Sequence, residues 1–342
     1  RPELTPTLAR MVAEQQGQLT FPLRWWSFDR FWRYERPQKG RGREFYQWNC
    51  DLIGDDSVMS DVEMLEITIA FFRSLNVTAQ DVVIEISDRE YLNKLMEEKN
   101  LGAKRNEVFR FLDKLPKLAR EEQLDFAREL GFTDTETSTI LALFDKDNTT
   151  WQGSERLTQI MANLTAKGLA DWVTPNLSIV RGFLYYTGMV FEASDRNKQY
   201  RAMVGGGRYA NLVAAVGGQP VSGIGFGAGD MVLTLFLEEK GLMPAYTPET
   251  NVCVVGIGTS VTEFSTTCVT QLRKAGLNII NYGVTDKLGK AIKFTDQKRI
   301  PYVGIIGEAE VTERKITLKN LESGDQQTVS IAEAINILNQ TA

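Results

Sequence analysis

The sequence predicts an α+β domain that is interrupted by a helical segment and followed by a small α/β domain. Two strand-like runs, residues 25–35 and 44–53, lie near the start of the 342-residue chain. Apolar residues recur only at helical spacing between residues 90 and 172, and strands alternate with helices after residue 251. Such alternation is typical of a mostly parallel sheet, whereas the earlier strands are separated from the helices along the chain.

The first domain is predicted to combine residues 1–89 with residues 173–240. After the two strand-like runs, residues 60–76 have apolar side chains at helical spacing, and Ser60 with Glu63 matches a capping box. The other elements of this domain are three predicted strands and a glycine-rich stretch: residues 82–87, 177–181, 189–193 and 205–229.

The helical segment, residues 90–172, contains no strand pattern and is predicted to be an inserted domain. A polar stretch with two prolines, residues 240–251, is predicted to be a linker. The C-terminal domain, residues 249–342, is predicted to end in two short strands around Gly324. Its preceding elements are predicted as strands 252–256, 278–282 and 302–306 and helices 261–275 and 286–298.

Composition limits the kinds of chemistry and partner. The net charge of −5 argues against a protein coated with basic side chains, but it leaves room for a local basic groove. No apolar run approaches the roughly 18 residues of a membrane span. Three cysteines without C-x-x-C spacing fit a reducing cytoplasm rather than a disulfide framework or zinc knuckle. The chain has no histidine, which excludes histidine-based triads, general bases and metal ligands.

The two strand-like runs are the most informative part of the chain. Side chains alternate between faces along a strand, so one face of the first run carries Phe31, Arg33 and Glu35. One face of the second run presents Phe45, Gln47, Asn49 and Asp51, and the other presents Tyr46, Trp48, Cys50 and Leu52. The second set can pack in a core, whereas the first set favours ligand recognition. A charged hairpin tip on a solvated sheet is the alternative.

The loop that joins the two runs is basic. It contains Arg36, Lys39, Arg41 and Arg43. Guanidinium groups bind phosphate oxygens in pairs, so this cluster favours a polyphosphate ligand. A solvated loop tip is the alternative for Arg41 and Arg43.

The hairpin, residues 31–51, resembles motif 2 of class II aminoacyl-tRNA synthetases in the form found in the histidyl-tRNA synthetase family. Four further segments resemble, in order, a first histidine-binding segment, the histidine-specific motif, the glycine-rich floor and motif 3: residues 1–7, 177–192, 204–209 and 223–229. The resemblance covers nearly the whole chain. It implies a class II catalytic domain with an antiparallel sheet, a helical insertion and a C-terminal α/β anticodon-binding domain. Because Arg1 is not an initiator methionine and already belongs to a motif, an N-terminal part is expected to be missing.

The resemblance implies a histidine–tRNA ligase. Such an enzyme activates L-histidine with ATP to histidyl-adenylate and transfers the histidyl group to the 3′ end of tRNA(His). Both steps need charge neutralisation and alignment more than a general base, so a site without histidine can carry them out. ATP is expected to act with Mg²⁺, with no metal ligands predicted among the protein side chains. The chain is expected to form a homodimer in the cytoplasm, with no membrane partner.

Two arginines are implied to be catalytic. Arg33 would hold the α-phosphate, and Arg181 would stabilise the pentavalent phosphorus without accepting a proton. From the residues alone, Arg33 could instead form a salt bridge with Glu35 or Asp51, and Arg181 could be an ordinary strand-end arginine.

The remaining ATP contacts implied by the resemblance come from the same hairpin. Glu35 would contact the adenine amino group, Phe45 would stack on the ring, and Arg41 and Arg43 would hold the outer phosphates. Phe45 could instead be a plain core residue.

Six residues are implied to bind histidine: Glu3, Thr5, Gln47, Asp51, Tyr185 and Tyr186. The first three suit the ammonium group. Asp51 and Tyr186 suit the two imidazole nitrogens, and Tyr185 would line the pocket. Aromatic core is the alternative for the two tyrosines. The glycines at 205–207 would let the backbone approach the substrate closely.

The chain departs from the family pattern in motif 3. That motif normally ends with an arginine that touches the outer phosphates of ATP, whereas this chain has Gly229-Asp230-Met231. We expect Arg41, Arg43 or Arg208 to compensate. Motif 1, which builds the dimer interface in the family, is not in this sequence.

Two noncatalytic relatives are the alternatives to a ligase. One is the regulatory subunit that senses histidine for ATP phosphoribosyltransferase, and the other is a sensor of uncharged tRNA. The regulatory subunit usually lacks the full motif 2 set and the anticodon domain.

The C-terminal domain has a basic cluster, which is predicted to be either a contact for tRNA phosphates or a solvated helix face. It consists of Lys287, Lys290, Lys293, Lys298 and Arg299.

Overall fold

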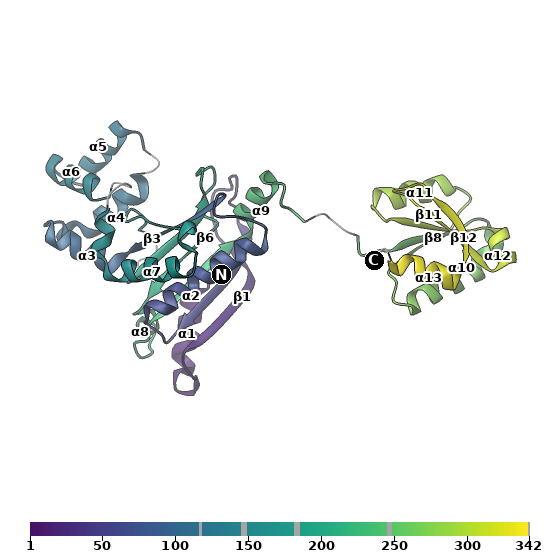
Figure 1. Ribbon diagram of the computed structural model, residues 1–342, viewed down its shortest axis with the longest axis horizontal. Helices are drawn as coiled ribbons and strands as arrows, with labels where there is room; N and C mark the ends of the chain where they lie inside the picture. The colour runs from purple at the N-terminus through teal and green to yellow at the C-terminus, as the bar shows by residue number, and fades with distance from the viewer. Residues whose placement is uncertain (116–117, 145–148, 181–184, 245–247, 341–342) are drawn as a thin grey trace. The chain divides into compact units, whose positions relative to one another are not determined.

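The computed structural model describes residues 1–115, 118–144, 149–180, 185–244 and 248–340. The chain forms two compact units, Arg1–Met243 and Pro244–Ala342, each with its own sheet (Figure 1). The boundary between the units lies within the segment predicted to be a linker.

The first unit is built on a seven-stranded sheet with the order β1-β2-β7-β6-β5-β3-β4. All neighbouring strands in it are antiparallel except β3 and β4. This arrangement confirms the predicted α+β fold with an antiparallel sheet. The strands are β1 (Leu23–Trp32), β2 (Glu44–Ile53), β3 (Val82–Asp88), β4 (Val173–Pro175), β5 (Met189–Asp195), β6 (Val204–Tyr209) and β7 (Gly223–Gly229).

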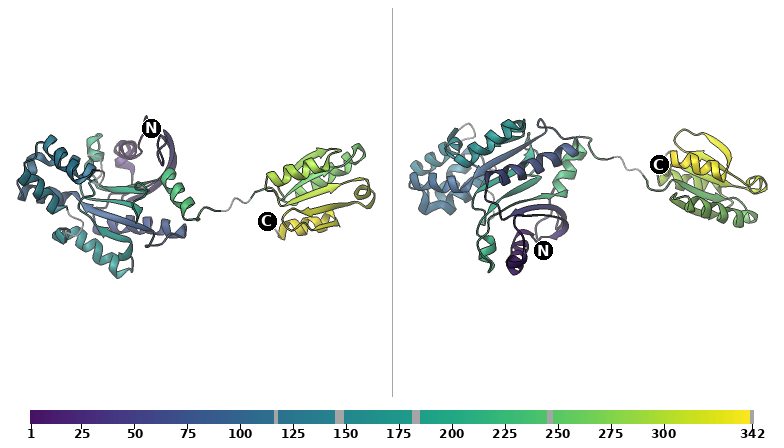
Figure 2. Two further views of the ribbon diagram at one scale, coloured as in Figure 1. Left: turned by 90° about the horizontal axis from the view of Figure 1, so that it is seen from above. Right: turned by 60° about the horizontal axis from the view of Figure 1, so that its bottom comes forward.

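Two long helices cover one face of this sheet. Helices α2 (Val58–Ser74) and α7 (Glu155–Ala166) pack together and lie on the same side of the sheet (Figure 2). The predicted alternation in β2 explains the packing, because Cys50 and Leu52 point into the same core as Val62 and Leu65 of α2. A helix with apolar residues along one side is stable only when it buries them in this way.

Two helices cover one end of the opposite face of the sheet. Helices α1 (Thr5–Gln15) and α8 (Leu212–Ala215) pack on each other and on Leu23 and Ile53, where they form a small separate core with Val12. The rest of this face, called the open face below, borders a cavity, and α9 (Asp230–Glu239) follows β7 directly.

Helix α2 begins earlier than predicted. Its N-cap is Ser57, whose Oγ accepts a hydrogen bond from the backbone N–H of Ser60 at 3.3 Å. Ser60 therefore lies inside the helix, and Glu63 forms an ion pair with Arg24 instead of capping the helix. The predicted capping box of Ser60 and Glu63 is wrong, because Ser57 competes for the same role one turn earlier.

The strand predicted at 177–181 is also wrong over its described residues, 177–180, which form a turn and irregular backbone. The chain leaves the sheet after Pro175. The side chain of Asn176 accepts hydrogen bonds from the backbone N–H of Ser178 at 3.0 Å and from its hydroxyl at 2.6 Å. Asparagine side chains that bond the backbone two residues later stabilise turns, which explains the break.

The described residues between β3 and β4 contain helices and no strand, as predicted. Besides α7, these helices are α3 (Arg89–Glu98), α4 (Arg105–Lys114), α5 (Arg120–Glu129) and α6 (Asp134–Leu143). Their side chains share one core with the sheet, since Val108 and Ile140 belong to the same cluster as Ile84.

Along the chain as a whole, short 3₁₀ turns lie at Gln16–Gln18, Gly102–Lys104, Thr149–Gly153, Ala170–Trp172 and Thr259–Val261.

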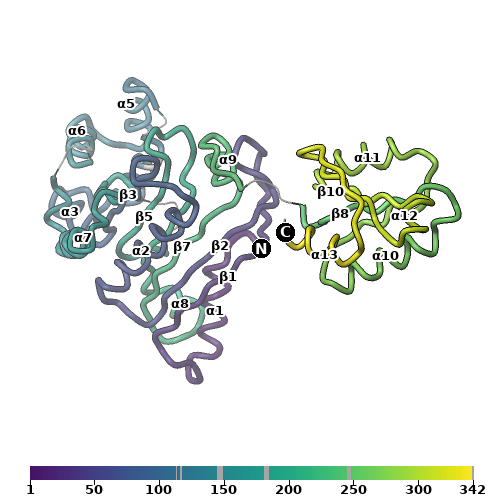
Figure 3. Tube along the Cα trace, turned by 45° about the vertical axis from the view of Figure 1, so that its right-hand side comes forward, coloured from purple at the N-terminus to yellow at the C-terminus, as the bar shows by residue number. Residues whose placement is uncertain are grey.

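The second unit is an α/β sandwich around a five-stranded sheet with the order β12-β11-β10-β8-β9. Strands β8, β9 and β10 are parallel, and β11 and β12 are antiparallel additions. Helices α10 and α13 cover one face and α11 covers the other (Figure 3). The elements are β8 (Val252–Gly256), α10 (Thr262–Lys274), β9 (Ile279–Val284), α11 (Leu288–Gln297), β10 (Tyr302–Ile306), α12 (Glu308–Glu313), β11 (Lys315–Asn320), β12 (Gln326–Ser330) and α13 (Ile331–Gln340).

The sequence predicted this alternation but not helices α12 and α13. Among the described residues, none of the helices combines the length and apolar character needed to cross a bilayer.

Candidate active site

The open face of the seven-stranded sheet carries a cavity of about 760 Å³. Glycines of β6 and β7, including Gly205, Gly225 and Gly227, form part of its lining. A Cβ atom at Gly225 would lie 2.2 Å from Oδ1 of Asp51, and one at Gly227 would lie 2.9 Å from Nε2 of Gln47. The glycines therefore leave room for polar side chains of β2 to lean over the sheet.

Strand β2 forms one side of the cavity. Phe45, Gln47 and Asn49 line it, as the predicted alternation requires. Asp51 lies one step further along the same face and is only 4% exposed. The hairpin thus presents an aromatic ring, two amides and a carboxylate in a row.

A buried tyrosine holds Asp51 in place. The hydroxyl of Tyr209 on β6 donates a hydrogen bond of 2.7 Å to Oδ1 of Asp51. Burial raises the pKa of Asp51 to about 7, and the hydrogen bond from Tyr209 opposes that rise. Gly223 makes room for the Tyr209 ring, since a Cβ there would lie 2.4 Å from a ring carbon. Asp51 is therefore a carboxyl group that can change its charge near neutral pH.

A second carboxylate is held by another tyrosine. The hydroxyl of Tyr185 donates a hydrogen bond to Glu3, and both residues line the cavity with Thr5. The Tyr185 ring also packs on Tyr186, with 4.8 Å between ring centroids, and on Tyr209. Burial raises the pKa of Tyr185 far above its usual value, so its hydroxyl keeps its proton and acts as a donor. This end of the cavity combines carboxylates with hydroxyl groups.

The other end of the cavity is basic. The guanidinium of Arg33 lies 5.0 Å from the centre of the Phe45 ring, and its Nε donates to the Pro2 carbonyl at 2.8 Å. Arg41 forms an ion pair with Glu35, and the hydrogen bond from Arg41 is the main reason that the pKa of Glu35 is lowered. Arg201, on the loop between β5 and β6, also lines this end.

Comparison with known proteins decides which family this arrangement belongs to. The family model described as histidyl-tRNA synthetase matches residues 1–230, and the model of an anticodon-binding domain matches residues 251–341. The chain belongs to the histidyl-tRNA synthetase family.

Similar proteins agree with this assignment. The chain is 34% identical to a histidine–tRNA ligase of Halobacterium salinarum, over 97% of this chain and 79% of that protein. It is 32% identical to the chloroplastic/mitochondrial histidine–tRNA ligase of Arabidopsis thaliana, over 97% of this chain and 71% of that protein. The crystal structure of histidyl-tRNA synthetase from Nostoc sp. PCC 7120 superimposes with a TM-score of 0.81 at 25% identity, covering 100% of this chain and 83% of that one.

A further solved structure supports the fold alone. It is described as an ATP phosphoribosyltransferase regulatory subunit/histidyl-tRNA synthetase from Bacillus halodurans C. It superimposes with a TM-score of 0.66 at 21% identity, covering 90% of this chain and 79% of that one.

Most of the residues expected from the family motifs meet in the one cavity. Those that line it are Glu3, Thr5, Arg33, Glu35, Arg41, Phe45, Gln47, Tyr185 and Tyr186. Asp51 lies next to the cavity, behind Tyr209 and beside Gly225. Arg43 is exposed and does not line the cavity; its Nε donates to the Glu35 carbonyl at 3.1 Å. Arg181 lies outside the described residues. The salt bridge considered for Arg33 is not formed with Glu35 or Asp51, both of which are described.

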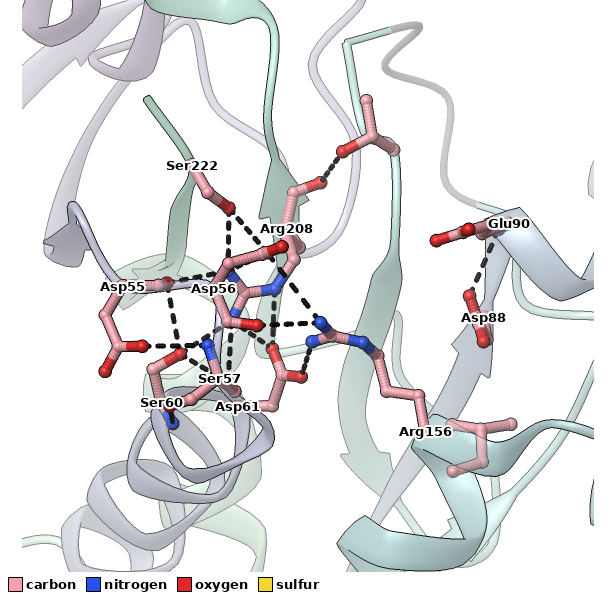
Figure 4. Close-up of polar contacts among 12 residues, drawn as sticks. Asp55, Asp56, Ser57, Ser60, Asp61, Asp88, Glu90, Arg156, Arg208 and Ser222 are labelled. Atoms are coloured by element: carbon pink, nitrogen blue, oxygen red, sulfur yellow. Dashed lines mark hydrogen bonds and ion pairs between the residues drawn. The ribbon is translucent and has the colours of Figure 1, made fainter. Parts of the chain in front are cut away.

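The proposed compensation by Arg208 is wrong. Arg208 alternates with Gly207 and Tyr209 on β6, so its side chain points to the helix-covered face, away from the cavity. There it is 2% exposed and binds Asp61 of α2 through Nε at 2.9 Å and Nη2 at 2.7 Å. Arg156 of α7 reaches the other oxygen of Asp61, so two guanidinium groups meet one buried carboxylate (Figure 4).

Among the cavity residues that sequence reasoning missed are Tyr209 and Arg201. Tyr209 shares the period of two with Gly205 and Gly207, so alternation along that run would have placed it on the cavity face. Arg201 lies on a loop, where no periodic pattern predicts the direction of a side chain.

Proposed function

We infer that this chain is a histidine–tRNA ligase, which activates L-histidine with ATP and transfers the histidyl group to the 3′ end of tRNA(His). One observation carries the inference: a single cavity joins a basic, aromatic end that suits ATP to an end with carboxylates and hydroxyls that suits histidine. The family membership and the relatives named as histidine–tRNA ligases support the same activity.

In the first step, the carboxylate of histidine attacks the α-phosphate of ATP and pyrophosphate leaves. We propose that Arg33 binds the α-phosphate and stabilises the charge of the pentavalent phosphorus together with Arg181. Phe45 would stack on adenine, and Glu35 would accept a hydrogen bond from its amino group. Arg41 and Arg43 would contact the outer phosphates.

Recognition of histidine would use the other end of the cavity. Glu3, Thr5 and Gln47 would bind the ammonium group, with Tyr185 fixing the position of Glu3 through its hydrogen bond. Asp51 and Tyr186 would bind the two imidazole nitrogens. A site that pairs both ring nitrogens rejects amino acids that would leave its buried polar groups without partners.

ATP is proposed to bind with Mg²⁺. Mg²⁺ is usually held by one or two carboxylates together with substrate phosphates. Glu85 on β3 and Glu192 on β5 lie opposite each other across the strand pair and line the cavity, and Glu85 would have to exchange its ion pair with Lys198 for the metal. Within the described residues, no group of three or more acidic or cysteine side chains could form a separate metal site.

The chain is also proposed to act in the cytoplasm as a homodimer. Edge strand β1 exposes aromatic side chains on one face, with Trp26 72% and Phe28 61% exposed, which would suit a subunit interface. A molar mass of one chain, measured by light scattering, would rule out the dimer.

In the second unit, the exposed lysines of α11 are proposed to contact tRNA phosphates.

The decisive experiment is ATP–pyrophosphate exchange with each amino acid in turn, followed by charging of tRNA(His). Exchange that depends on histidine alone is expected, together with attachment of histidine to the tRNA through an ester that is stable in acid and hydrolysed by mild base. A regulatory subunit or a sensor of uncharged tRNA would bind its ligand without any exchange, so absence of exchange would refute the proposed function.

Replacing Tyr209 by phenylalanine is expected to shift the pH dependence of kcat/KM for histidine to higher pH. The Tyr209 hydrogen bond lowers the pKa of Asp51, so its loss raises a pKa that already lies at about 7. If the carboxylate form of Asp51 binds imidazole, kcat/KM increases as pH rises through this pKa, and the variant reaches its plateau later.

The pH profile of the variant must be compared with that of the wild type, because the imidazole of the free substrate histidine also titrates at about pH 6.5. That titration is the same for the wild type and the variant, so a difference between the profiles reports Asp51. Tyr34→Phe is a suitable control, since Tyr34 is 94% exposed. Superimposable profiles for the wild type and Tyr209→Phe would show that Asp51 does not control histidine binding.

A further inference from the structure

The described basic residues of the cavity differ in whether a carboxylate already neutralises them. Arg33, Arg41, Lys198 and Arg201 line the cavity. Arg41 forms an ion pair with Glu35, and Lys198 forms one with Glu85. Within the part of the chain that the structure describes, Arg33 and Arg201 form no ion pair. A polyphosphate binds most favourably to cations that do not first have to break an ion pair with a carboxylate.

Arg201 lies beside the loop that joins β1 and β2. Its Nη2 donates a hydrogen bond of 3.3 Å to Oε1 of Gln38 on that loop. Next to it, the ammonium of Lys39 lies 5.1 Å from the centre of the Tyr200 ring. The segment 196–203 therefore packs against the basic loop. Its residue Arg201 lines the same cavity as Arg33 and Arg41.

The base of this segment is fixed by hydrogen bonds. Asp195 accepts from the backbone N–H groups of Gln199 and Tyr200, both at 2.9 Å. Arg196 donates to the carbonyl oxygens of Ala79 and Asp171. A loop held at its base in this way can present a side chain to a ligand at little conformational cost.

The segment that would carry the motif 3 arginine has no cation. Residues 223–239 contain neither arginine nor lysine. At the start of α9, Asp230 accepts a hydrogen bond of 3.1 Å from the backbone N–H of Tyr46, so its carboxylate serves to join α9 to β2. The outer phosphates must find their positive partner on another element.

We propose that Arg201 binds the outer phosphates of ATP and so replaces the arginine that motif 3 lacks. The proposal rests on the function proposed above. Arg33 binds the α-phosphate, while Arg201 exchanges its neutral bond to Gln38 for charge-assisted bonds to the β- or γ-phosphate. When the α–β bridge breaks, Arg201 stays with the leaving pyrophosphate and stabilises its added charge.

The test compares ATP with AMP, which lacks the outer phosphates. Dissociation constants are measured by calorimetry without histidine, for the wild type, Arg201→Ala, Arg201→Lys and Gln38→Ala. Arg201→Ala is expected to weaken ATP binding about tenfold or more and to leave AMP binding unchanged, since bonds to charged groups contribute about 1.5–3 kcal/mol. Arg201→Lys is expected to retain part of the affinity for ATP.

Gln38→Ala separates phosphate binding from loop positioning. It removes the neutral partner of Arg201, and ATP affinity is expected to stay within about twofold of the wild type. Equal losses for Gln38→Ala and Arg201→Ala would assign Arg201 a positioning role and overturn the proposal. Equal losses for ATP and AMP, or no loss for either, would overturn it as well.

The binding measurement also separates this proposal from the proposed function. If the wild type binds ATP and Arg201→Ala loses ATP selectively, but no histidine-dependent exchange occurs, the ligase assignment fails and the phosphate site stands. If exchange occurs and Arg201→Ala binds ATP normally, the ligase assignment stands and this proposal fails. A wild type that binds no ATP would overturn both.

Discussion

Replacing Arg33 by alanine is expected to lower kcat of histidine-dependent ATP–pyrophosphate exchange by about 10²- to 10³-fold. Arg33 lines the cavity without an ion pair among the described residues, and its guanidinium lies 5.0 Å from the Phe45 ring on which adenine is proposed to stack. The charge on the α-phosphate increases when the histidine carboxylate attacks it. A cation at this position therefore stabilises the transition state more than the bound ATP.

The matched control for this prediction is Arg30→Ala. Arg30 lies three residues earlier in the same hairpin, but it contacts Tyr46 and Glu44 on the other face. Exchange by Arg30→Ala is expected to stay close to that of the wild type. If Arg33→Ala instead raised KM for ATP and left kcat unchanged, Arg33 would bind ground state and transition state equally and would not be catalytic.

The second strand of the hairpin could be predicted from the sequence because alternation is a local property, whereas the first spans Leu23–Trp32 instead of the predicted 25–35, so that Arg33 and Glu35 lie beyond its end. Strand β2 begins and ends where the pattern predicts, and its two faces separate the cavity side chains from the core side chains. The family motifs added which ligand each side chain would meet. Alternation applied to β6 would also have placed the Arg208 side chain on the face away from the cavity. The expectation that Arg208 contacts ATP relied only on its nearness in sequence to the glycines, although the pattern that contradicts it was present.

Other features depend on contacts between distant parts of the chain. Arg201 acquires its position from hydrogen bonds at 195–200 and from packing against residues 36–43, and no local pattern encodes that meeting. The end of β4 depends on the side chain of Asn176. The N-cap of α2 was ambiguous, because Ser57 and Ser60 are separated by one turn and either could begin a helix.

Replacing Arg208 by alanine is expected to lower the free energy of unfolding of the first unit by about 3–5 kcal/mol. The Arg208 side chain is 3% exposed and that of Asp61 is fully buried. Besides Asp61, Arg208 binds Ser60, Ser222 and Asp56 and the carbonyl oxygens of Asp55 and Ser57. Its removal leaves a buried carboxylate with Arg156 as its remaining ionic partner, together with several unsatisfied polar groups.

The size of this loss is expected to depend on pH. Burial raises the pKa of Asp61 above its ordinary value, and Arg208 opposes that rise, so the pKa is higher still in the variant. A carboxyl group whose pKa is raised on folding destabilises the folded state as pH increases from its unfolded pKa through its folded pKa. Urea unfolding should therefore show a smaller difference between variant and wild type near pH 4 than near pH 8.

Arg24→Ala is the matched control for stability, because Arg24 also pairs with a carboxylate of α2. Both oxygens of Glu63 accept from its guanidinium, at 2.7 and 2.9 Å, but the Arg24 side chain is 55% exposed. Exposed ion pairs stabilise proteins little, so this variant is expected to unfold close to the wild type. If Arg208→Ala were equally mild, the cluster around Asp61 would not be what holds β6 to α2 and α7, and the glycine floor of the cavity would depend on apolar packing alone.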